Sequence, residues 1–295
     1  MEKNIRILIC AVGTKGLNFV TGAAQKWPIG TVITYAQDNV MDDACTAIRE
    51  LCKSNSIRCV ENRHPSLKDF EPFDICFIVG WQYLLKDIDQ RTIVFHDSLL
   101  PKYRGFVPTL TALIAGDKRI GATALSPNAV MDAGPVMAQE AIDITYPITL
   151  GEAFEKLSGC YLRMAEQLVI AAQSGTLTSL AKEQDESQAT YSIWRDQQDQ
   201  RIDWTKSSDH IQRFVNALTY PYTGARTWYE GNEIIVHEVS IEPEVAFAER
   251  FPGKLWQIRD NIPLIVCGTG MAKIIKATSL NDESVKFLRL RTRCV

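Results

Sequence analysis

The sequence lacks the features that mark a membrane protein, a metalloprotein or a nucleic-acid-binding protein. No uninterrupted apolar run approaches the roughly 20 residues that cross a bilayer, so no membrane partner is expected. The formal net charge is only -3, without a polybasic run, so nucleic acid is not an expected partner. The eight cysteines include no C-x-x-C pair, so neither a metal site nor a disulfide framework is expected.

What remains is an ordinary folded chain with room for two domains. Its 295 residues are 46% hydrophobic and 23% charged, a composition that supports one large core or two smaller ones. The first residues, MEKNIRILIC, enter a strand-like run without the layout of a signal peptide, so we expect a cytoplasmic location. Cys10, Cys76 and Cys267 fall inside apolar runs, where buried free thiols are expected.

The first half alternates strand-like and helix-like segments, which predicts an α/β fold with a doubly wound, mostly parallel, Rossmann-like sheet. The apolar strand-like runs are IRILICAVG, TVITYAQD, IRCV, DICFIVGW and TIVFHD, and the helix-like patterns are GLNFVTGAAQKW and DDACTAIRELCKSN. Farther along, VPTLTALIAGD predicts a short helix, and IGATAL with PVMAQEAIDI predicts a strand pair. Because ligands bind beyond the carboxyl ends of such strands, we expect Trp81 and His96 to line one crevice.

The second half predicts a long helix, a connector and a small all-β domain. Thr149 and Glu152 form a capping box ahead of a long apolar stripe at helical spacing. A polar connector over residues 174–204 leads to a helix capped by Ser207 or Ser208, and then to short strands split by Gly and Pro. We therefore predict a catalytic domain over residues 1–190, a linker over 191–206 and a smaller C-terminal β-barrel-like domain over 207–295.

Among four histidines, His96 stands out because it ends an apolar strand beside a turn. Asp132, in a later loop, offers a carboxylate that can accept an imidazole hydrogen bond and fix the tautomer. Asp97 is a competing partner, but neighbouring strand residues point to opposite faces. Taken alone, a single histidine is more often structural, and Asp132 fits a turn-forming residue before Ala133-Gly134-Pro135.

Three segments together resemble the signature of the folate-dependent formyltransferases, a family that includes sugar N-formyltransferases and methionyl-tRNA formyltransferases. They are HDSLLPKYRG, GDKRIGATAL and MDAGPVM, in which His96 and Asp132 lie 36 residues apart. TYSIWRDQQDQRIDW and LTYPYTGARTWYEG resemble the family's linker and the turn that opens its C-terminal barrel domain. The resemblance covers most of the chain from about residue 75, whereas AVGTKG fits a tight strand-to-helix turn better than a phosphate cradle.

The resemblance implies transfer of a formyl group from 10-formyltetrahydrofolate to an amine, which needs a proton-moving group and an oxyanion donor. By analogy, His96 supplies a proton or hydrogen bond, and Asp132 orients it and supports it electrostatically. The pteridine is expected at Trp81, Gln82, Tyr83, Leu84, Leu85, Asn128, Val130 and Met131, although Trp81 and Tyr83 equally fit core aromatics. The substrate is expected at Ser98, Lys102, Tyr103 and Arg104, although residues 102–104 also fit a solvated basic turn.

One position departs from the family pattern, which has asparagine two residues before the histidine. Here Val94 stands there, and valine cannot donate a hydrogen bond to a developing oxyanion. Another donor could replace it, such as Ser98, a backbone N–H or an ordered water; the reaction could be slow; or the protein could only bind folate. Because His96 and Asp132 are both present, our hypothesis is an active enzyme with a remodelled oxyanion site.

The resemblance leaves several acceptor amines open, and a nucleotide-linked amino sugar is the leading one. Lys102, Arg104, Trp194, Arg195 and Tyr222 are candidates for its phosphates and base by residue type. A tRNA acceptor is disfavoured, because residues 206–295 contain 12 Lys and Arg against 10 Asp and Glu, and AQDNVMDDACTAIRE is acidic. Hydroxylated ornithine, hydrolysis of the formyl folate and a non-catalytic folate-binding relative are the alternatives. A homodimer paired through exposed barrel edges is also expected.

Overall fold

The computed structural model describes residues 5–37, 43–220 and 222–295 and forms two compact units. Unit 1 comprises residues 5–108, 119–143 and 154–193 of the described chain, and unit 2 comprises 109–118, 144–153 and 194–295. Part of the acidic AQDNVMDDACTAIRE stretch lies outside the described residues, as does Pro221. The two units interleave along the chain. The domain limits drawn from the sequence stay predictions.

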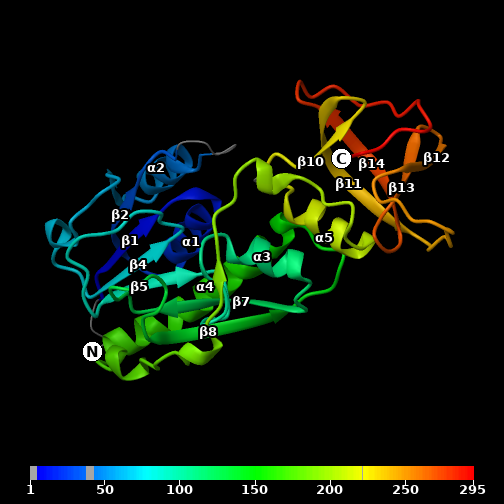
Figure 1. Ribbon diagram of the computed structural model, residues 1–295. Helices are drawn as coiled ribbons and strands as arrows, with labels where there is room; N and C mark the ends of the chain where they lie inside the picture. The colour runs from blue at the N-terminus through cyan, green and yellow to red at the C-terminus, as the bar shows by residue number, and fades with distance from the viewer. Residues whose placement is uncertain (1–4, 38–42, 221) are drawn as a thin grey trace. The chain divides into compact units, whose positions relative to one another are not determined.

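Unit 1 contains a seven-stranded sheet in the order β3-β2-β1-β4-β5-β7-β8 (Figure 1). The parallel strands are β1 (Ile7–Ala11), β2 (Ile29–Thr34), β3 (Arg58–Glu61), β4 (Ile75–Val79) and β5 (Thr92–His96). They are followed by an antiparallel pair, β7 (Arg119–Leu125) and β8 (Val136–Asp143). This confirms the predicted doubly wound, mostly parallel sheet. The strand order reverses beside β1, and such a switch point is where ligands bind in open α/β sheets.

The central strands β1, β4 and β5 are apolar because both faces of the sheet are covered there. On one face, Phe77 and Phe95 contact Phe19 of α1 (Gly13–Lys26) and Tyr161 of α4 (Leu150–Gln173), with ring centroids 5.1 to 5.7 Å apart. The opposite face is a separate buried cluster of Leu8, Cys10, Ile33, Leu67, Phe73, Cys76 and Ile78. Alternation along β5 places Val94 and His96 on this second face.

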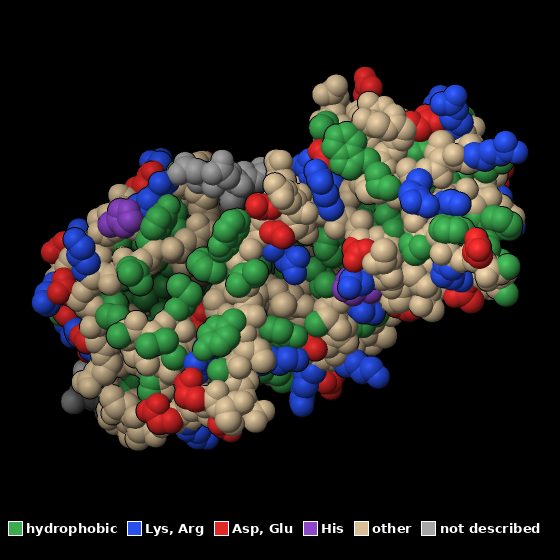
Figure 2. Space-filling view, viewed as in Figure 1, with side chains coloured by type: hydrophobic (Ala, Val, Ile, Leu, Met, Phe, Trp, Pro, Cys, Tyr) green, Lys and Arg blue, Asp and Glu red, His purple; other side chains and the backbone are tan. Residues whose placement is uncertain are grey.

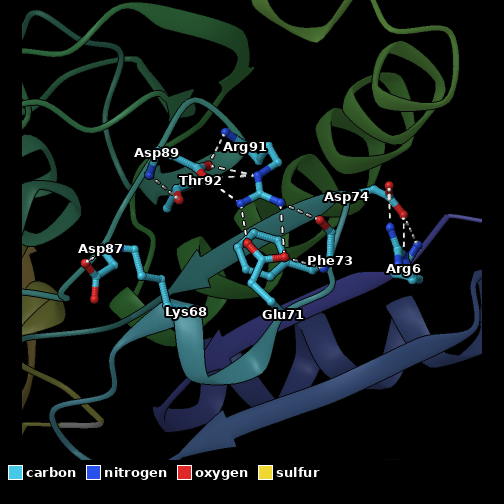
Figure 3. A network of polar contacts seen from close by, with 9 residues as sticks. All are labelled: Arg6, Lys68, Glu71, Phe73, Asp74, Asp87, Asp89, Arg91 and Thr92. Atoms are coloured by element: carbon cyan, nitrogen blue, oxygen red, sulfur yellow. Dashed lines mark hydrogen bonds and ion pairs between the residues drawn. The ribbon is translucent and has the colours of Figure 1, made fainter.

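An ion-pair network fixes the start of β5 (Figure 3). Arg91 binds the carboxylates of Asp89 and Glu71, donates a 2.8 Å hydrogen bond to the Phe73 carbonyl, and lies 4.3 Å from the Phe73 ring centroid. These contacts lower the pKa of both carboxyl groups below their ordinary values, chiefly through hydrogen bonds from Arg91. The strand that delivers His96 is therefore anchored at its opposite end.

Two helix N-termini carry the caps that the sequence predicts. Thr149 and Glu152 form the predicted capping box, in which each side chain accepts the other's backbone N–H, at 2.8 and 3.3 Å. The predicted Ser207 cap of α5 accepts the His210 N–H at 3.2 Å. The remaining helices are α2 (Cys45–Ser54), α3 (Pro108–Ala115), α5 (Ser208–Ala217), and the 3-10 turns η1 (Leu67–Phe70), η2 (Leu177–Leu180), η3 (Glu186–Gln188) and η4 (Gln198–Gln200). In the described chain, no helix is long and apolar enough to span a membrane.

Unit 2 is built on a five-stranded antiparallel sheet in the order β10-β11-β14-β13-β12. Its strands are β10 (Ala225–Tyr229), β11 (Asn232–Glu242), β12 (Leu255–Arg259), β13 (Ile262–Val266) and β14 (Met271–Ser279). The segment Thr292–Val295 joins the two edges: Val295 exchanges backbone hydrogen bonds with Trp228, and the Thr292 carbonyl accepts from Leu255 N–H at 3.1 Å. This closure confirms a barrel-like C-terminal domain.

Candidate active site

The site is built around His96 at the carboxyl end of β5. The side chain is 7% exposed, and its Nε2 lies 2.8 Å from the Tyr103 carbonyl oxygen. Because a carbonyl oxygen only accepts, Nε2 carries a hydrogen in this contact. The other ring nitrogen, Nδ1, lies 3.5 Å from Asp132 Oδ2. The fold thus brings the two residues predicted as an acid-base pair together from loops far apart in the chain.

The Asp132 carboxylate is held by the backbone of the loop that follows His96. Its Oδ2 accepts the Gly105 N–H at 2.8 Å, so one oxygen faces both that amide and the imidazole. The Asp97 carboxylate pairs with Lys15 of α1, whose ammonium lies 4.5 Å from the Phe154 ring centroid. This arrangement follows from the alternation of neighbouring residues at the strand end.

Several residues around this pair have left-handed backbone conformations. Tyr103, Gly105, Val107 and Asp132 have φ values of 61°, 101°, 44° and 54°, in the left-handed region that non-glycine residues rarely adopt. For a β-branched residue such as Val107 the conformation is especially unfavourable. Residues held in such conformations cost about 1 to 3 kcal/mol each, and they cluster at sites where geometry is functional.

The loop from Asp97 to Tyr103 is fixed by hydrogen bonds that the sequence did not reveal. Ser98 Oγ donates to the Lys102 carbonyl at 2.6 Å, and Thr123 Oγ1 donates to the Ser98 carbonyl at 2.7 Å. Gln139 Nε2 donates to the Leu100 carbonyl at 2.9 Å. Ser98 was expected to meet the substrate or an oxyanion, but it is 4% exposed and its hydroxyl hydrogen is already used inside the loop.

Arg104 requires a correction, because it was expected at an accessible edge facing an anionic substrate. It is 2% exposed, and its guanidinium donates to Gln184 Oε1 at 2.8 and 3.2 Å and to the Glu186 carboxylate at 2.7 and 2.8 Å. Hydrogen bonding to Glu186 raises the pKa of Arg104, so the pair is a structural one. Lys102 is exposed, and its ammonium lies 4.7 Å from the Tyr103 ring centroid.

The residues predicted to hold a pteridine lie in two exposed segments of unit 1. Leu84, Val130 and Met131 are 91%, 61% and 57% exposed, and Asn128 Oδ1 accepts the Val130 N–H. Gln82 and Tyr83 are also exposed, whereas Leu85 is half-buried. Figure 2 shows hydrophobic side chains gathered on the visible face of unit 1, with charged side chains mainly around the rim.

Trp81 is a predicted ligand-binding residue with a buried, unsatisfied hydrogen-bond donor. Its ring stands at 90° to the Tyr35 ring, with centroids 4.8 Å apart, and it packs on the apolar cluster together with Leu85 and Val94. Its buried Nε1 finds no hydrogen-bond acceptor among the residues that the structure describes. Burial also raises the pKa of Tyr35 to about 12. A ligand acceptor placed here would satisfy the indole N–H, which is costly to leave unpaired.

The arrangement can move a proton at a strand end. An imidazole whose Nδ1 faces a carboxylate can take up a proton there, and the adjacent negative charge stabilises the resulting imidazolium. The Gly105 amide keeps the carboxylate in place. The described residues also form an open, shallow pocket of about 450 Å³ in unit 2, lined by residues of the β10–β11 hairpin and by residues 279–285, but no predicted site residue lines it. Fold and site together define an α/β protein with an acid-base pair at the carboxyl end of a parallel strand.

Comparison with known proteins identifies the family. Residues 77–159 match the formyl transferase family model, and residues 195–290 match the model for the formyl transferase C-terminal domain. The chain is 30% identical over 234 residues to the methionyl-tRNA formyltransferase of Bartonella henselae, covering 74% of this chain and 70% of that protein. It is 32% identical over 187 residues to the Enterococcus faecalis enzyme of the same name, covering 63% and 58%. The chain belongs to the formyltransferase family.

Several solved structures share the fold. WlaRD, a sugar 3N-formyl transferase crystallised with dTDP and 5-N-formyl-THF, matches with a TM-score of 0.67 and 14% identity, covering 97% of this chain and 100% of that one. The N-formyltransferase of Helicobacter canadensis, solved with folinic acid and dTDP-3-aminofucose, gives 0.63 and 14% over 92% and 98%. Aquifex aeolicus HypX in complex with tetrahydrofolic acid gives 0.59 and 17% over 97% and 46%. The match to the Enterococcus and Streptococcus relatives spans 58% to 60% of their length.

Proposed function

We propose that this protein is an N-formyltransferase that moves a formyl group from 10-formyltetrahydrofolate to the amine of a nucleotide-linked amino sugar. The observation that carries the proposal is the contact between His96 Nδ1 and Asp132 Oδ2, with the Gly105 N–H on the same carboxylate oxygen. Membership of the formyltransferase family supports a formyl donor of this kind, as do the folates named with the structures of WlaRD and HypX.

The reaction balances without any further co-reactant. The amine lone pair attacks the formyl carbon, the bond from that carbon to N10 of the folate breaks, and a formamide and tetrahydrofolate result. The attacking nitrogen loses one proton and N10 gains one, so a group that first accepts and then donates is sufficient. His96 fills this role, and Asp132 stabilises the imidazolium between the two transfers.

The residues near Trp81 fit a pteridine in chemical terms. A pteridine offers a flat aromatic surface and ring acceptors, and Trp81 offers an unpaired indole N–H beside the exposed Tyr83 and Leu84. Val94 lies on the same apolar cluster and contributes no donor to the His96 face. The Ser98 hydroxyl already donates its hydrogen to the Lys102 carbonyl. The oxyanion donor of the remodelled site is therefore a backbone N–H or an ordered water.

Two acceptors, a nucleotide-linked amino sugar and methionyl-tRNA, are each supported by a different comparison. The sequence relatives act, by name, on methionyl-tRNA, whereas the fold neighbour WlaRD is by name a sugar 3N-formyl transferase and the Helicobacter N-formyltransferase was solved with dTDP-3-aminofucose. The charge of residues 206–295, 12 basic against 10 acidic, favours the sugar, because tRNA affinity depends on neutralising phosphates. The expected cytoplasmic location and homodimer stay predictions.

The test is a substrate panel. Purified protein is incubated with 10-formyltetrahydrofolate and one acceptor at a time: dTDP-linked 3- and 4-amino sugars, initiator methionyl-tRNA, hydroxyornithine, or no amine. Release of tetrahydrofolate is followed by absorbance, and the formylated product by mass spectrometry. We expect turnover with an amino sugar and none without an amine. Turnover only with tRNA replaces the acceptor, release without amine indicates a hydrolase, and folate binding without any release indicates a non-catalytic relative.

A further inference from the structure

One segment of unit 1 runs beside both loops of the active site, and we name residues 182–192 the strap. At its start, Lys182 and Val136 exchange backbone hydrogen bonds of 2.8 and 2.9 Å next to the Asp132 loop. At its end, the Arg104 N–H donates to the Thr190 carbonyl at 2.9 Å, and β6 (Arg104–Gly105) pairs with β9 (Tyr191–Ser192) beside the His96 loop. The strap therefore contacts the loop that follows His96 and the strand that follows the Asp132 loop.

Gln184 lies near the start of the strap and uses its whole amide on these two loops. Its Nε2 donates to the Asp132 carbonyl at 2.8 Å and to the Gly134 carbonyl at 2.7 Å. Its Oε1 accepts from Arg104 Nε and Nη2 at 3.2 and 2.8 Å. A single side chain thus bridges the backbone of Asp132 and the residue next to Gly105, whose N–H binds the Asp132 carboxylate.

The Asp132 loop needs such a support because its conformation is constrained. Asp132 has a φ of 54°, and a Cβ at Gly134 would lie 1.8 Å from the Ser126 carbonyl oxygen. Tight turns of this kind keep a strained residue in place only when neighbouring contacts over-determine it. The two hydrogens of the Gln184 amide supply contacts on either side of the turn.

We propose that Gln184 is a positioning residue that sets the separation between Asp132 and His96. This inference rests on the proposed function, in which that pair moves the proton. Without the amide hydrogens, the two carbonyls lose their donor, the loop relaxes, and the carboxylate moves away from the imidazole. A misplacement of about 1 Å in such a group lowers turnover by on the order of a hundredfold while leaving substrate contacts in place.

Two substitutions separate positioning from simple anchoring of the strap. Gln184→Glu keeps an acceptor for Arg104 but cannot donate to the Asp132 and Gly134 carbonyls, whereas Gln184→Leu loses both functions. The matched control is Gln188→Leu in the same strap, whose amide nitrogen contacts Ser187 Oγ at 3.4 Å. Melting curves establish that each variant is folded. Initial rates give kcat and KM, and the imidazole ¹⁵N shifts of His96, one of four histidines, report its surroundings without requiring turnover.

We expect both Gln184 variants to lose about 10- to 100-fold in kcat with KM changed less than about threefold, and the His96 ring shifts to move. Gln188→Leu should behave as the parent protein. Full activity in Gln184→Glu would overturn the inference, because the Arg104 contact alone would then suffice. If the parent protein shows no turnover, the proposed function fails instead; unchanged His96 shifts in both Gln184 variants would overturn the positioning role independently.

Discussion

Gly105 is the position where adding one methyl group tests the geometry of the site most directly. A Cβ built there lies 2.4 Å from the Ser192 carbonyl oxygen, and the residue has a φ of 101°. The Gly105→Ala variant therefore meets two obstacles, a left-handed backbone and a clash with the backbone of the strap. The Gly105 N–H is also the donor to Asp132 Oδ2, so any shift is passed to the carboxylate.

The expected loss in the free energy of unfolding follows from these two obstacles. A non-glycine residue at this φ costs about 1 to 2 kcal/mol. The clash requires a separation of roughly 1 Å between two backbone segments, which strains the β6–β9 pairing and lengthens a charge-assisted hydrogen bond worth about 1.5 to 3 kcal/mol. We expect the free energy of unfolding to fall by about 3 kcal/mol in total. Turnover should fall by on the order of a hundredfold.

Gly175→Ala provides the matched control, because Gly175 has a φ of 70° but nothing lies within 4 Å of an added Cβ. It should lose about 1 kcal/mol from its backbone conformation and no activity. Urea unfolding gives the stability of both variants, and initial rates of tetrahydrofolate release give turnover. If Gly105→Ala is as mild as Gly175→Ala in both assays, the close approach of strap and loop has no role in the site.

Three further outcomes are expected. Val94→Asn should raise kcat by about tenfold or more by placing a donor on the His96 face, and a fall in rate would show that the face already has its donor. His96→Asn should abolish turnover but keep folate affinity in a binding titration, and Asp132→Asn should lower kcat by about a hundredfold or more; wild-type rates in either would refute the pair. Arg91→Gln should lower the free energy of unfolding by about 1 to 2 kcal/mol in chemical denaturation at neutral pH. Arg91 lowers the folded-state pKa of Asp89, so the stabilisation that this ion pair gives the folded state is present above pH about 4 and is lost as the pH falls. Wild type should therefore lose more stability than Arg91→Gln between about pH 5 and 3.

The fold was largely predictable because each element carries a local signal. Apolar runs of strand length, a Thr-x-x-Glu capping box and a Ser cap depend only on neighbouring residues, and all appear in the structure. The pairing of His96 with Asp132 was proposed from a strand-end histidine and a loop carboxylate and strengthened by family resemblance, because 36 residues separate them and no periodicity connects them. The interleaving of the two units was missed, since helix α3 has the same local pattern whichever core it joins.

The supports of the site were also beyond the sequence. Gln184 lies in a polar, irregular stretch that reads as a surface connector, and its role depends on carbonyls contributed by residues 132 and 134. Arg104 was misjudged for the same reason: a basic residue in a turn is usually solvated, but here a distant Gln184 and Glu186 meet its guanidinium. Non-local hydrogen bonds of this kind leave no periodic trace along the chain.

The C-terminal segment Thr292–Val295 has a consequence for how this protein behaves in solution. An open sheet presents unpaired N–H and C=O groups on both edges, which invite strand addition from other molecules. Here the same few residues occupy positions on β10 and at the start of β12 through Trp228 and Leu255. Displacing this segment would leave backbone groups at the edges of β10 and β12 unpaired at once. Fusions or truncations at this end should therefore promote aggregation before they affect chemistry in unit 1.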